Sequence, residues 1–371
     1  MRLALFFTCG VSLEKWAMIG NLEREIKPYS ELSKQFEKIY FFTYGSLSDL
    51  KFQTYFPQNA VILPKKWKIP ACFYAFLLPF FYWHILKETD ILKTNQMASA
   101  VPAVIVKILF RHKKLVLRTG YEWLSFLQKA KKAKWKRTIV FLWEKIAYKA
   151  ANVIIFSSQQ DREFAQKKFN IPQRKTRFIP NYIDTDLFKP QAVEKEKGRL
   201  IFIGRLTKQK NITSLIESIA GLPVKLTIIG QGELKSELAE LAKEKNAAVE
   251  FKDKVPNEQL PEILNKAEIF ILSSFYEGCP KTLLEAMACS LPCIATNVEG
   301  IKEIIVHKEN GFLCQTDSAS IRTAILAVLN DKPLQEKLSK AARETILENF
   351  SLEKIIQQES ALYFNICPAI F

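Results

Sequence analysis

The sequence predicts an α/β protein with two Rossmann-like domains, each built around a parallel sheet. Short apolar runs that suit buried strands alternate with longer amphipathic stretches along nearly the whole chain, which is typical of repeated β-α units. The length of 371 residues is enough for two domains of ordinary size. A segment rich in Pro, Asn and Asp, residues 177–190, has the composition of a linker. We therefore expect one domain over 1–183, a second over 184–350 and a tail helix within 351–371.

The composition is that of a globular protein and disfavours several other classes. Hydrophobic residues make up 48% of the chain and charged residues 25%. The seven cysteines form no CxxC pair, so we expect reduced thiols in a cytoplasmic protein. With three histidines, a metal site built from His is not expected. The apolar run at the N-terminus is too short for a signal peptide and is interpreted as a first strand.

The net charge of +16 is concentrated in one half of the chain. Residues 1–188 hold 31 Lys and Arg against 14 Asp and Glu, a net charge of +17, whereas residues 189–371 hold 23 against 24. The first half is therefore expected to face an anionic partner, either nucleic acid or an acidic membrane. No helix-turn-helix, RRM or zinc-finger spacing is found, so we expect a membrane and no nucleic acid.

The elements of the first domain follow from its apolar pattern. The run LALFF predicts a strand over 3–7, and Thr8, Gly10 and Ser12 form a small-residue loop before a helix that reaches Lys38. Such a loop after a strand is either a ligand-facing corner or a plain β-α turn. The later elements are expected to be strand 39–43, a short strand ending at 63, helix 101–110, strand 114–117, helix 138–150, strand 153–157 and helix 159–169.

Two segments of the first domain, 65–86 and 129–137, combine cations with aromatic residues. The first contains an apolar run over 71–86 that is interrupted by Pro79 and is too short to span a bilayer. It fits either a buried helix pair or a helix lying among lipid headgroups. The second places Trp135 among six cations and is either a solvated helix face or a membrane footprint. We expect these segments to hold the protein peripherally on the inner face of an anionic membrane.

The second domain is expected to contain strands at 200–203, 225–229, 249–251, 269–272 and 292–295, a helix from Glu233, a helix from Pro280, a helix opened by Gly300 and Glu303, and helices over 318–349. Its central stretch, residues 268–300, predicts a strand, a polar turn and a helix. Pro280 suits the first turn of that helix. The free amides at a helix start that follows a strand and a turn bind phosphate well. Glu277 and Glu285 flank this helix start, and their carboxylates can accept hydrogen bonds from neutral hydroxyls, such as those of a sugar or ribose.

The spacing Glu277-x7-Glu285, within EGCPKTLLEAMACSLPCIA, resembles the signature of the retaining GT-B glycosyltransferases of family 4. The resemblance implies a GT-B fold with two parallel sheets facing a cleft and a C-terminal helix that crosses back to the first domain. It also implies that Thr8, Gly10 and Ser12 lie on the acceptor side. The donor-binding residues that it implies are Gly204, Arg205, Lys210, Gly230, Lys254, Val255, Glu277, Gly278, Cys279, Pro280, Lys281, Thr282, Leu283 and Glu285.

Particular roles follow from the same resemblance. Arg205 and Lys210 would bracket the donor diphosphate, Glu277 would hold sugar hydroxyls, and Glu285 would hold the ribose. Many family members carry a histidine just after the strand that is expected here over 114–117. This chain has none there. Arg118 and Glu122 are the substitutes that we expect at the catalytic centre, and ordinary loop packing is the alternative for both residues.

The resemblance implies a metal-independent hexosyltransferase with no cofactor. It would move a hexose with retention from a nucleotide-diphosphate sugar to a glycan or lipid-linked hydroxyl, in cell-surface polysaccharide or glycolipid synthesis. The alternatives are a catalytically silent membrane scaffold and a sugar-nucleotide epimerase. A two-carboxylate glycosidase is disfavoured because its carboxyl groups must flank one anomeric centre. Asp184 and Asp186 match a metal-binding DxD motif, but in an interdomain turn a chance match is the preferred interpretation.

Overall fold

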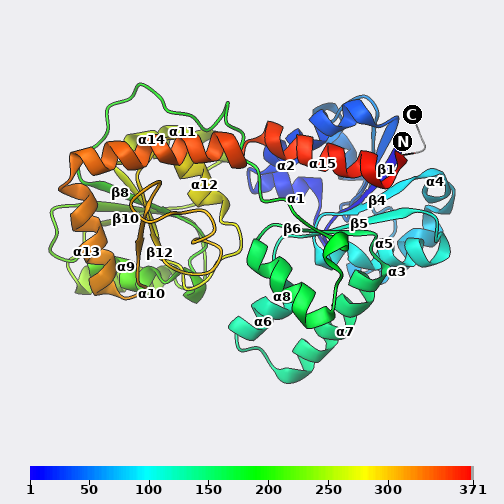
Figure 1. The fold of residues 1–371 in the computed structure, drawn as a ribbon, viewed down its shortest axis with the longest axis horizontal. Helices are drawn as coiled ribbons and strands as arrows, with labels where there is room; N and C mark the ends of the chain where they lie inside the picture. Colours follow the sequence, from blue (N-terminus) through cyan, green and yellow to red (C-terminus); the bar gives the residue numbers. More distant parts are fainter. Residues whose placement is uncertain (369–371) are drawn as a thin grey trace. The chain divides into compact units, whose positions relative to one another are not determined.

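A computed structural model describes residues 1–368, and the chain divides into two compact units (Figure 1). The first unit contains Met1–Pro180 and the residues from Ile356 onward, and the second contains Asn181–Ile355. Each unit has one sheet whose strands are all parallel. Parallel strands need crossover connections, and in both units helices provide them and cover the two faces of the sheet. The predicted pair of parallel α/β domains is confirmed.

The sheet of the first unit has seven strands in the order β3-β2-β1-β4-β5-β6-β7. Helices α2 and α15 lie over one face, and α3, α5 and α7 lie over the other (Figure 1). The strands are β1 (Arg2–Phe6), β2 (Lys38–Phe42), β3 (Ala60–Leu63), β4 (Ile91–Thr94), β5 (Lys114–Thr119), β6 (Val153–Phe156) and β7 (Thr176–Phe178). The helices are α1 (Leu13–Met18), α2 (Leu22–Leu32), α3 (Ala71–Phe81), α4 (Trp83–Glu88), α5 (Ala100–Leu109), α6 (Trp123–Lys129), α7 (Lys134–Ala150), α8 (Gln159–Phe169) and part of α15 (Leu352–Ile366).

The sheet of the second unit has six strands in the order β10-β9-β8-β11-β12-β13. Helices α11, α12 and α14 lie on one side of it, and α9 and α10 lie on the other (Figure 1). The strands are β8 (Arg199–Ile203), β9 (Lys225–Ile229), β10 (Val249–Lys252), β11 (Ile269–Leu272), β12 (Cys293–Thr296) and β13 (Phe312–Cys314). The helices are α9 (Ile212–Ile219), α10 (Lys235–Glu244), α11 (Leu260–Lys266), α12 (Lys281–Ala288), α13 (Ser318–Leu329) and α14 (Lys332–Asn349).

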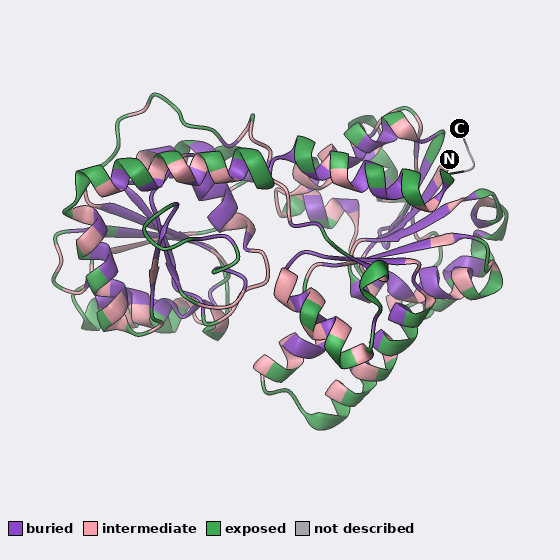
Figure 2. Cartoon of the chain, in the orientation of Figure 1, coloured by how far each residue is buried: buried purple, intermediate pink, exposed green. Residues whose placement is uncertain are grey.

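Burial explains why these segments adopt their structure. In Figure 2 the inner strands of both sheets are buried, as continuous apolar runs between two helix layers should be. The edge strands β7 and β10 are partly exposed. Side chains cap some of the helices: Ser158 accepts a hydrogen bond from Asp161 N at α8, and Asp331 accepts one from Leu334 N at α14. At these helices the local capping residue and the burial of the neighbouring sheet agree.

Several predicted elements differ in the structure. The single helix expected from Ser12 to Lys38 is two helices, separated at Gly20, which has a φ of +64°. The helix expected to open at Gly300 and Glu303 is wrong, because residues 300–304 form turns. Strands β4, β7 and β13 were not predicted; each has only three or four residues.

The apolar run over 71–86 forms α3 and α4, and it is not simply buried. Tyr74 and Leu78 of α3 are fully buried, whereas Phe73, Phe76 and Phe80 are 63%, 55% and 58% exposed. No helix in residues 1–368 is both long enough and apolar enough to cross a membrane.

Candidate functional site

The candidate site lies where the sheet of the second unit reverses its strand order. From β8 the chain adds β9 and β10 on one side and then places β11 on the other side of β8. The loops that follow β8 and β11 therefore leave the same edge of the sheet next to each other. Ligands of open α/β sheets bind at such a switch point.

Hydrogen bonds join these two loops. Gln209 and Phe275 are linked backbone to backbone, with N–O at 2.9 Å, and the Gln209 side chain donates to the Tyr276 carbonyl at 2.8 Å. The Ser273 hydroxyl donates to the Lys210 carbonyl at 2.8 Å. The β8 loop, predicted to hold phosphate, and the β11 loop, predicted to hold sugar, therefore form one surface.

At the centre of this surface, Lys210 and Glu277 form an ion pair. The Lys210 Nζ lies 2.5 Å from the Glu277 Oε1, and the Ser274 hydroxyl donates to the same oxygen at 2.6 Å. Both side chains are largely buried, at 11% and 8% exposure. Lys210 and Glu277 are 67 residues apart, so no local pattern in the sequence predicted that they pair. Ser274 was not among the expected site residues. A lysine ammonium has three donors, so Lys210 retains capacity for a second partner.

Two glycines allow the site loops to pack closely. At Gly230, with a φ of +152°, an added Cβ would lie 1.9 Å from the Gly204 carbonyl oxygen. At Gly300, with a φ of +80°, it would lie 2.3 Å from the Gly278 carbonyl oxygen. Gly230 was expected to bind the donor, and its direct structural role is to let the β9 loop approach the β8 loop. Gly300 lets the backbone around Glu277 pack closely against it. From the sequence, Gly300 was expected only at the start of a helix.

Helix α12 starts at this surface and continues into the core. Pro280 is its N-cap, and no side chain caps the helix by a hydrogen bond. Leu283, within its first turn, is fully buried together with Leu284, Ala286 and Met287. The first amides of a helix have no acceptor within it, so the positive end of its dipole faces the switch point.

Side chains from the linker segment pack beside the start of α12. The Asn181 amide donates to the Cys279 carbonyl at 2.7 Å. The Lys281 ammonium lies 5.1 Å from the centre of the Tyr182 ring, a cation–π distance. Asp184 accepts from the backbone amides of Asp186 and Leu187 within its own turn, which gives this aspartate a local structural role.

Glu285 is a buried carboxylate, not a residue on the helix surface. It is 1% exposed, and the Asn257 side-chain amide donates to its Oε1 at 3.2 Å. Asn257 ends the loop after β10 that also contains Lys254 and Val255, the residues expected near the nucleotide base. The structure thus brings that loop to Glu285. Burial, with a smaller contribution from Glu285, raises the pKa of the Cys289 thiol to about 12.

In the first unit, the expected acceptor-side loop is held by its own neighbours. Ser12 caps α1 by accepting from the Lys15 amide at 3.0 Å. The fully buried Asp49 accepts from the amides of Leu13 and Glu14 at 3.2 and 3.1 Å. The amides that start α1 are therefore satisfied by the protein. Thr8 accepts from the Val11 amide at 2.9 Å, and Gly10 makes the turn with a φ of +76°.

Arg118 and Glu122 make structural contacts in the first unit. The Arg118 guanidinium pairs with Glu359 of α15 at 3.0 Å and donates to the Pro180 carbonyl at 3.3 Å. Glu122 is 1% exposed and caps α6 by accepting from the Ser125 amide at 2.5 Å. These contacts hold both side chains within the first unit, and an action of either residue on an acceptor stays a prediction.

The sequence matches two family profiles that together cover most of the chain. Residues 31–187 match "Glycosyltransferase Family 4", and residues 184–345 match "Glycosyl transferases group 1". The chain belongs to family 4 of the GT-B glycosyltransferases. The second of these matches contains every residue from Gly204 to Glu285 that was expected to bind the donor.

Two bacterial enzymes resemble parts of this chain. The chain is 28% identical over 213 residues to N-acetyl-alpha-D-glucosaminyl L-malate synthase of Bacillus anthracis, covering 53% of this chain and 55% of that protein. It is 28% identical over 255 residues to UDP-Gal:alpha-D-GlcNAc-diphosphoundecaprenol alpha-1,3-galactosyltransferase of Escherichia coli, covering 62% and 64%. The matched region therefore spans less than two thirds of each relative.

The GT-B fold itself extends over the whole chain. The structure superimposes on sucrose-phosphate synthase from Thermosynechococcus elongatus with a TM-score of 0.78, and the match covers 100% of both chains at 20% sequence identity. The expected GT-B architecture is confirmed.

Proposed function

We propose that this glycosyltransferase moves a hexose from a nucleotide-diphosphate sugar to a hydroxyl of a glycan or lipid-linked acceptor, with retention at the anomeric carbon. The observation that carries the proposal is the Lys210–Glu277 pair, which lies at the switch point beside the start of α12. The Escherichia coli relative carries a UDP-sugar donor and a diphosphoundecaprenol acceptor in its name. A donor and acceptor of these classes fit the proposal.

The donor diphosphate would lie between the Lys210 ammonium, the exposed Arg205 guanidinium and the first amides of α12. Breaking the glycosidic bond places negative charge on the diphosphate, and fixed cations and amides lower the energy of that charge. We propose that these groups supply the stabilisation without a metal ion.

Two carboxylates would orient the rest of the donor. Glu277 already accepts hydrogen bonds from Lys210 and Ser274, and its remaining oxygen can accept from sugar hydroxyls. Glu285, fixed by Asn257, would accept from the ribose hydroxyls, with Lys254 and Val255 near the base. Buried acceptors of this kind select ligands with hydroxyl groups, because a ligand without them leaves a charged oxygen unsatisfied.

The proposed reaction exchanges one bond at the anomeric carbon. The bond from C1 to the diphosphate oxygen breaks, and its electron pair stays with the nucleoside diphosphate. The acceptor oxygen bonds to C1 on the face that the diphosphate leaves, and the acceptor proton passes to the departing diphosphate.

The test begins with calorimetric binding of UDP-, GDP- and ADP-sugars in the presence of EDTA. We expect micromolar binding of one donor by the wild type, at least a tenfold loss in Glu285→Ala and no loss in Glu336→Ala. Glu336 is an exposed carboxylate of α14 and provides a control for the charge change. Absence of binding by any donor would support the silent-scaffold alternative. The anomeric configuration of the product, read by NMR, tests retention.

We further propose that the first unit docks on an anionic membrane in order to reach its acceptor. Helix α3 carries exposed phenylalanines, and α7 carries an exposed apolar row made of Trp135, Ile139, Leu142 and Ile146. Both helices belong to the same layer, because α5 contacts each of them. The unit also carries the positive charge of the chain. Apolar side chains surrounded by cations suit an interface with anionic lipids.

A further inference from the structure

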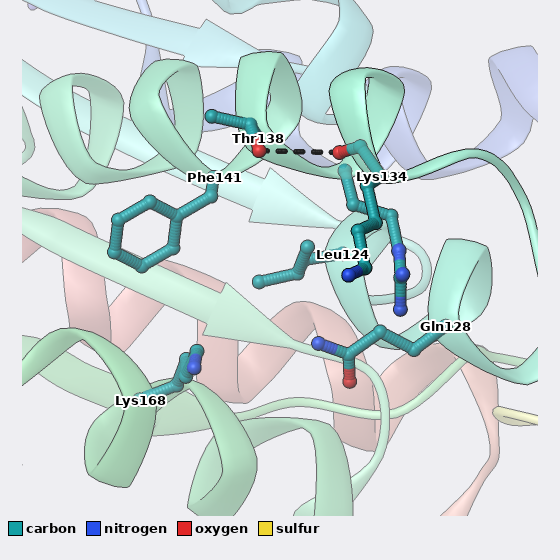
Figure 3. A pocket seen from close by; sticks show the side chains of 7 residues that line it. Leu124, Gln128, Lys134, Thr138, Phe141 and Lys168 are labelled. Carbon is teal, nitrogen blue, oxygen red and sulfur yellow. Dashed lines mark hydrogen bonds between the residues drawn. The ribbon is translucent and has the colours of Figure 1, made fainter.

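A cationic pocket lies between three helices of the first unit, outside the candidate donor site. It has a volume of about 290 Å³ and is open to solvent. Figure 3 shows side chains from α6, α7 and α8 around it. The pocket is lined by Leu124, Gln128, Lys134, Arg137, Thr138, Phe141 and Lys168.

The charges in this pocket all have the same sign. Lys134, Arg137 and Lys168 line it, and no Asp or Glu does. Among residues 1–368, no ion pair includes any of these three cations. The Arg137 Nε is buried and has no hydrogen-bond acceptor in the part of the chain that the structure describes. Two exposed lysines beside a half-buried arginine with an unsatisfied guanidinium N–H suit an anionic ligand.

The uncharged residues of the pocket provide an apolar surface and hydrogen-bond donors, which together suit an oxyanion. Phe141 and Leu124 form that surface, and the Lys168 ammonium lies 5.7 Å from the centre of the Phe141 ring. The Gln128 amide and the Thr138 hydroxyl can each donate a hydrogen bond, although Thr138 donates to the Lys134 carbonyl at 3.1 Å in this structure. A phosphate group, with several acceptor oxygens and negative charge, matches this set.

The pocket shares α7 with the exposed apolar row described above. Trp135, Ile139, Leu142 and Ile146 follow one another at spacings of four, three and four residues, so they lie along one face of the helix. Their exposed fractions are 52% or more. The pocket residues Lys134, Thr138 and Phe141 each lie one position before a residue of that row, so they lie on the adjoining face.

We propose that this pocket binds the phosphate of an anionic phospholipid headgroup, while the apolar row of α7 contacts the acyl region beside it. A lipid supplies both an anion and an adjacent apolar part, whereas a soluble phosphate supplies only the anion. The inference rests on the proposed membrane docking and adds a specific headgroup site to it. It does not depend on the donor chemistry.

The experiment compares vesicle binding by two variants of the full chain that lose the same charge. Arg137→Gln/Lys168→Gln removes two charges from the pocket. Lys145→Gln/Lys167→Gln removes two charges from exposed positions of α7 and α8, outside the pocket. Binding to vesicles of phosphatidylglycerol and of phosphatidylcholine is measured from low to high salt. Salt screens exposed charges more strongly than buried ones, and within the pocket the Arg137 Nε is buried.

At about 0.5 M salt, where diffuse attraction is strongly screened, we expect the wild type and the exposed-site variant to keep their preference for phosphatidylglycerol. The pocket variant should lose that preference, with at least a tenfold weaker affinity than the exposed-site variant. Equal losses in the two variants at every salt concentration would overturn the proposal. Unchanged thermal unfolding shows that both variants are folded.

A second arm distinguishes a lipid from a soluble phosphate. Glycerol phosphate and inorganic phosphate are titrated into the wild type and into Ile139→Ser/Leu142→Ser. We expect the wild type to bind lipid vesicles at least tenfold more tightly than either soluble anion, and the apolar-row variant to lose this difference. Soluble phosphate that binds as tightly as the vesicles would overturn the lipid assignment. Donor binding, measured on the same samples, should be unchanged, so a failure of the donor proposal is detected separately.

Discussion

Lys93 on β4 and Glu359 on α15 are 266 residues apart in the sequence and form a buried ion pair, with Nζ and Oε2 separated by 2.5 Å. Arg118 pairs with the other oxygen of Glu359, and the Tyr363 hydroxyl donates to Oε2 at 3.1 Å. Although burial acts in the opposite direction, the charges of Lys93 and Arg118 hold the pKa of Glu359 below its usual range. This cluster attaches the C-terminal helix to the sheet of the first unit.

Replacing Glu359 by Ala should destabilise the first unit by about 3–5 kcal/mol, because two cations are left without their common partner in a buried site. Glu353→Ala, an exposed position of the same helix, should change the free energy of unfolding by less than about 0.5 kcal/mol. Tryptophan fluorescence during urea unfolding measures the first unit alone, because all six tryptophans lie within residues 1–180. Equal stabilities of the two variants would contradict a stabilising role for the cluster.

A second buried cluster should make stability depend on pH. Glu144 is fully buried next to Glu122, and it accepts from the Trp123 and Leu124 amides at 3.1 and 3.3 Å. Burial and the neighbouring Glu122 carboxyl raise the pKa of Glu144 to about 10. The folded protein therefore keeps a proton that the unfolded chain releases above about pH 4.5. The stability from this group is complete at low pH and is lost as the pH rises toward 10.

Glu144→Gln removes this titration. Between pH 5 and 9 the free energy of unfolding of the wild type should fall relative to that of Glu144→Gln, by up to about 1.4 kcal/mol per pH unit. Tryptophan fluorescence in urea at a series of pH values measures the difference. Glu163→Gln, an exposed position on α8, should follow the wild type. Parallel pH profiles for wild type and Glu144→Gln would show that Glu144 ionises normally.

The Lys210–Glu277 pair predicts a specific pattern in nucleotide binding. Lys210→Ala should weaken binding of the nucleoside diphosphate about 10- to 100-fold, because a charged donor is lost and the Glu277 carboxylate remains beside the phosphate. Lys210→Ala/Glu277→Gln should recover part of this loss by removing the repulsion. Lys208→Ala, an exposed cation of the same loop, should stay within about twofold of the wild type by calorimetry. No recovery in the double variant would mean that Glu277 does not act on the diphosphate.

Gly300 should be required for the position of the β11 loop. Gly300→Ala forces a Cβ against the carbonyl oxygens of Gly278 and Glu277 at a φ of +80°, so it should reduce donor binding as well as stability. Gly221→Ala is the matched control, because it has a similar φ of +69° and no atom near the added Cβ. The control should lose about 1–2 kcal/mol from backbone strain alone and keep full donor affinity. Far-UV circular dichroism and calorimetry measure the two effects.

The exposed row of α7 should contribute to membrane binding. Ile139→Ser/Leu142→Ser should weaken binding to phosphatidylglycerol vesicles about tenfold or more, because apolar area is no longer removed from water. Val306→Ser/Leu347→Ser removes exposed apolar side chains from the second unit and should leave vesicle binding unchanged. A similar loss in both variants would argue against docking through the first unit.

Much of the fold could be predicted because sequence pattern and burial agree. The apolar runs at β1, β8 and β11 are continuous, as expected of strands covered on both faces, and all three were predicted. Strand β4 was missed because its sequence, ILKT, contains a lysine that is polar by every local criterion. Its burial depends on Glu359, whose position is known only once α15 lies on the sheet.

The sequence by itself determined the alternation of strands and helices, the family and the two glutamates proposed to bind the donor. These are local patterns, so nearest neighbours along the chain are sufficient to specify them. Only the tertiary structure decided that Lys210 pairs with Glu277, that Asn257 reaches Glu285, and that Arg118 pairs with Glu359. Each of these pairs joins residues that are far apart in the sequence and that strand order and helix packing bring together. The folded geometry therefore determines which side chain pairs with each buried charge.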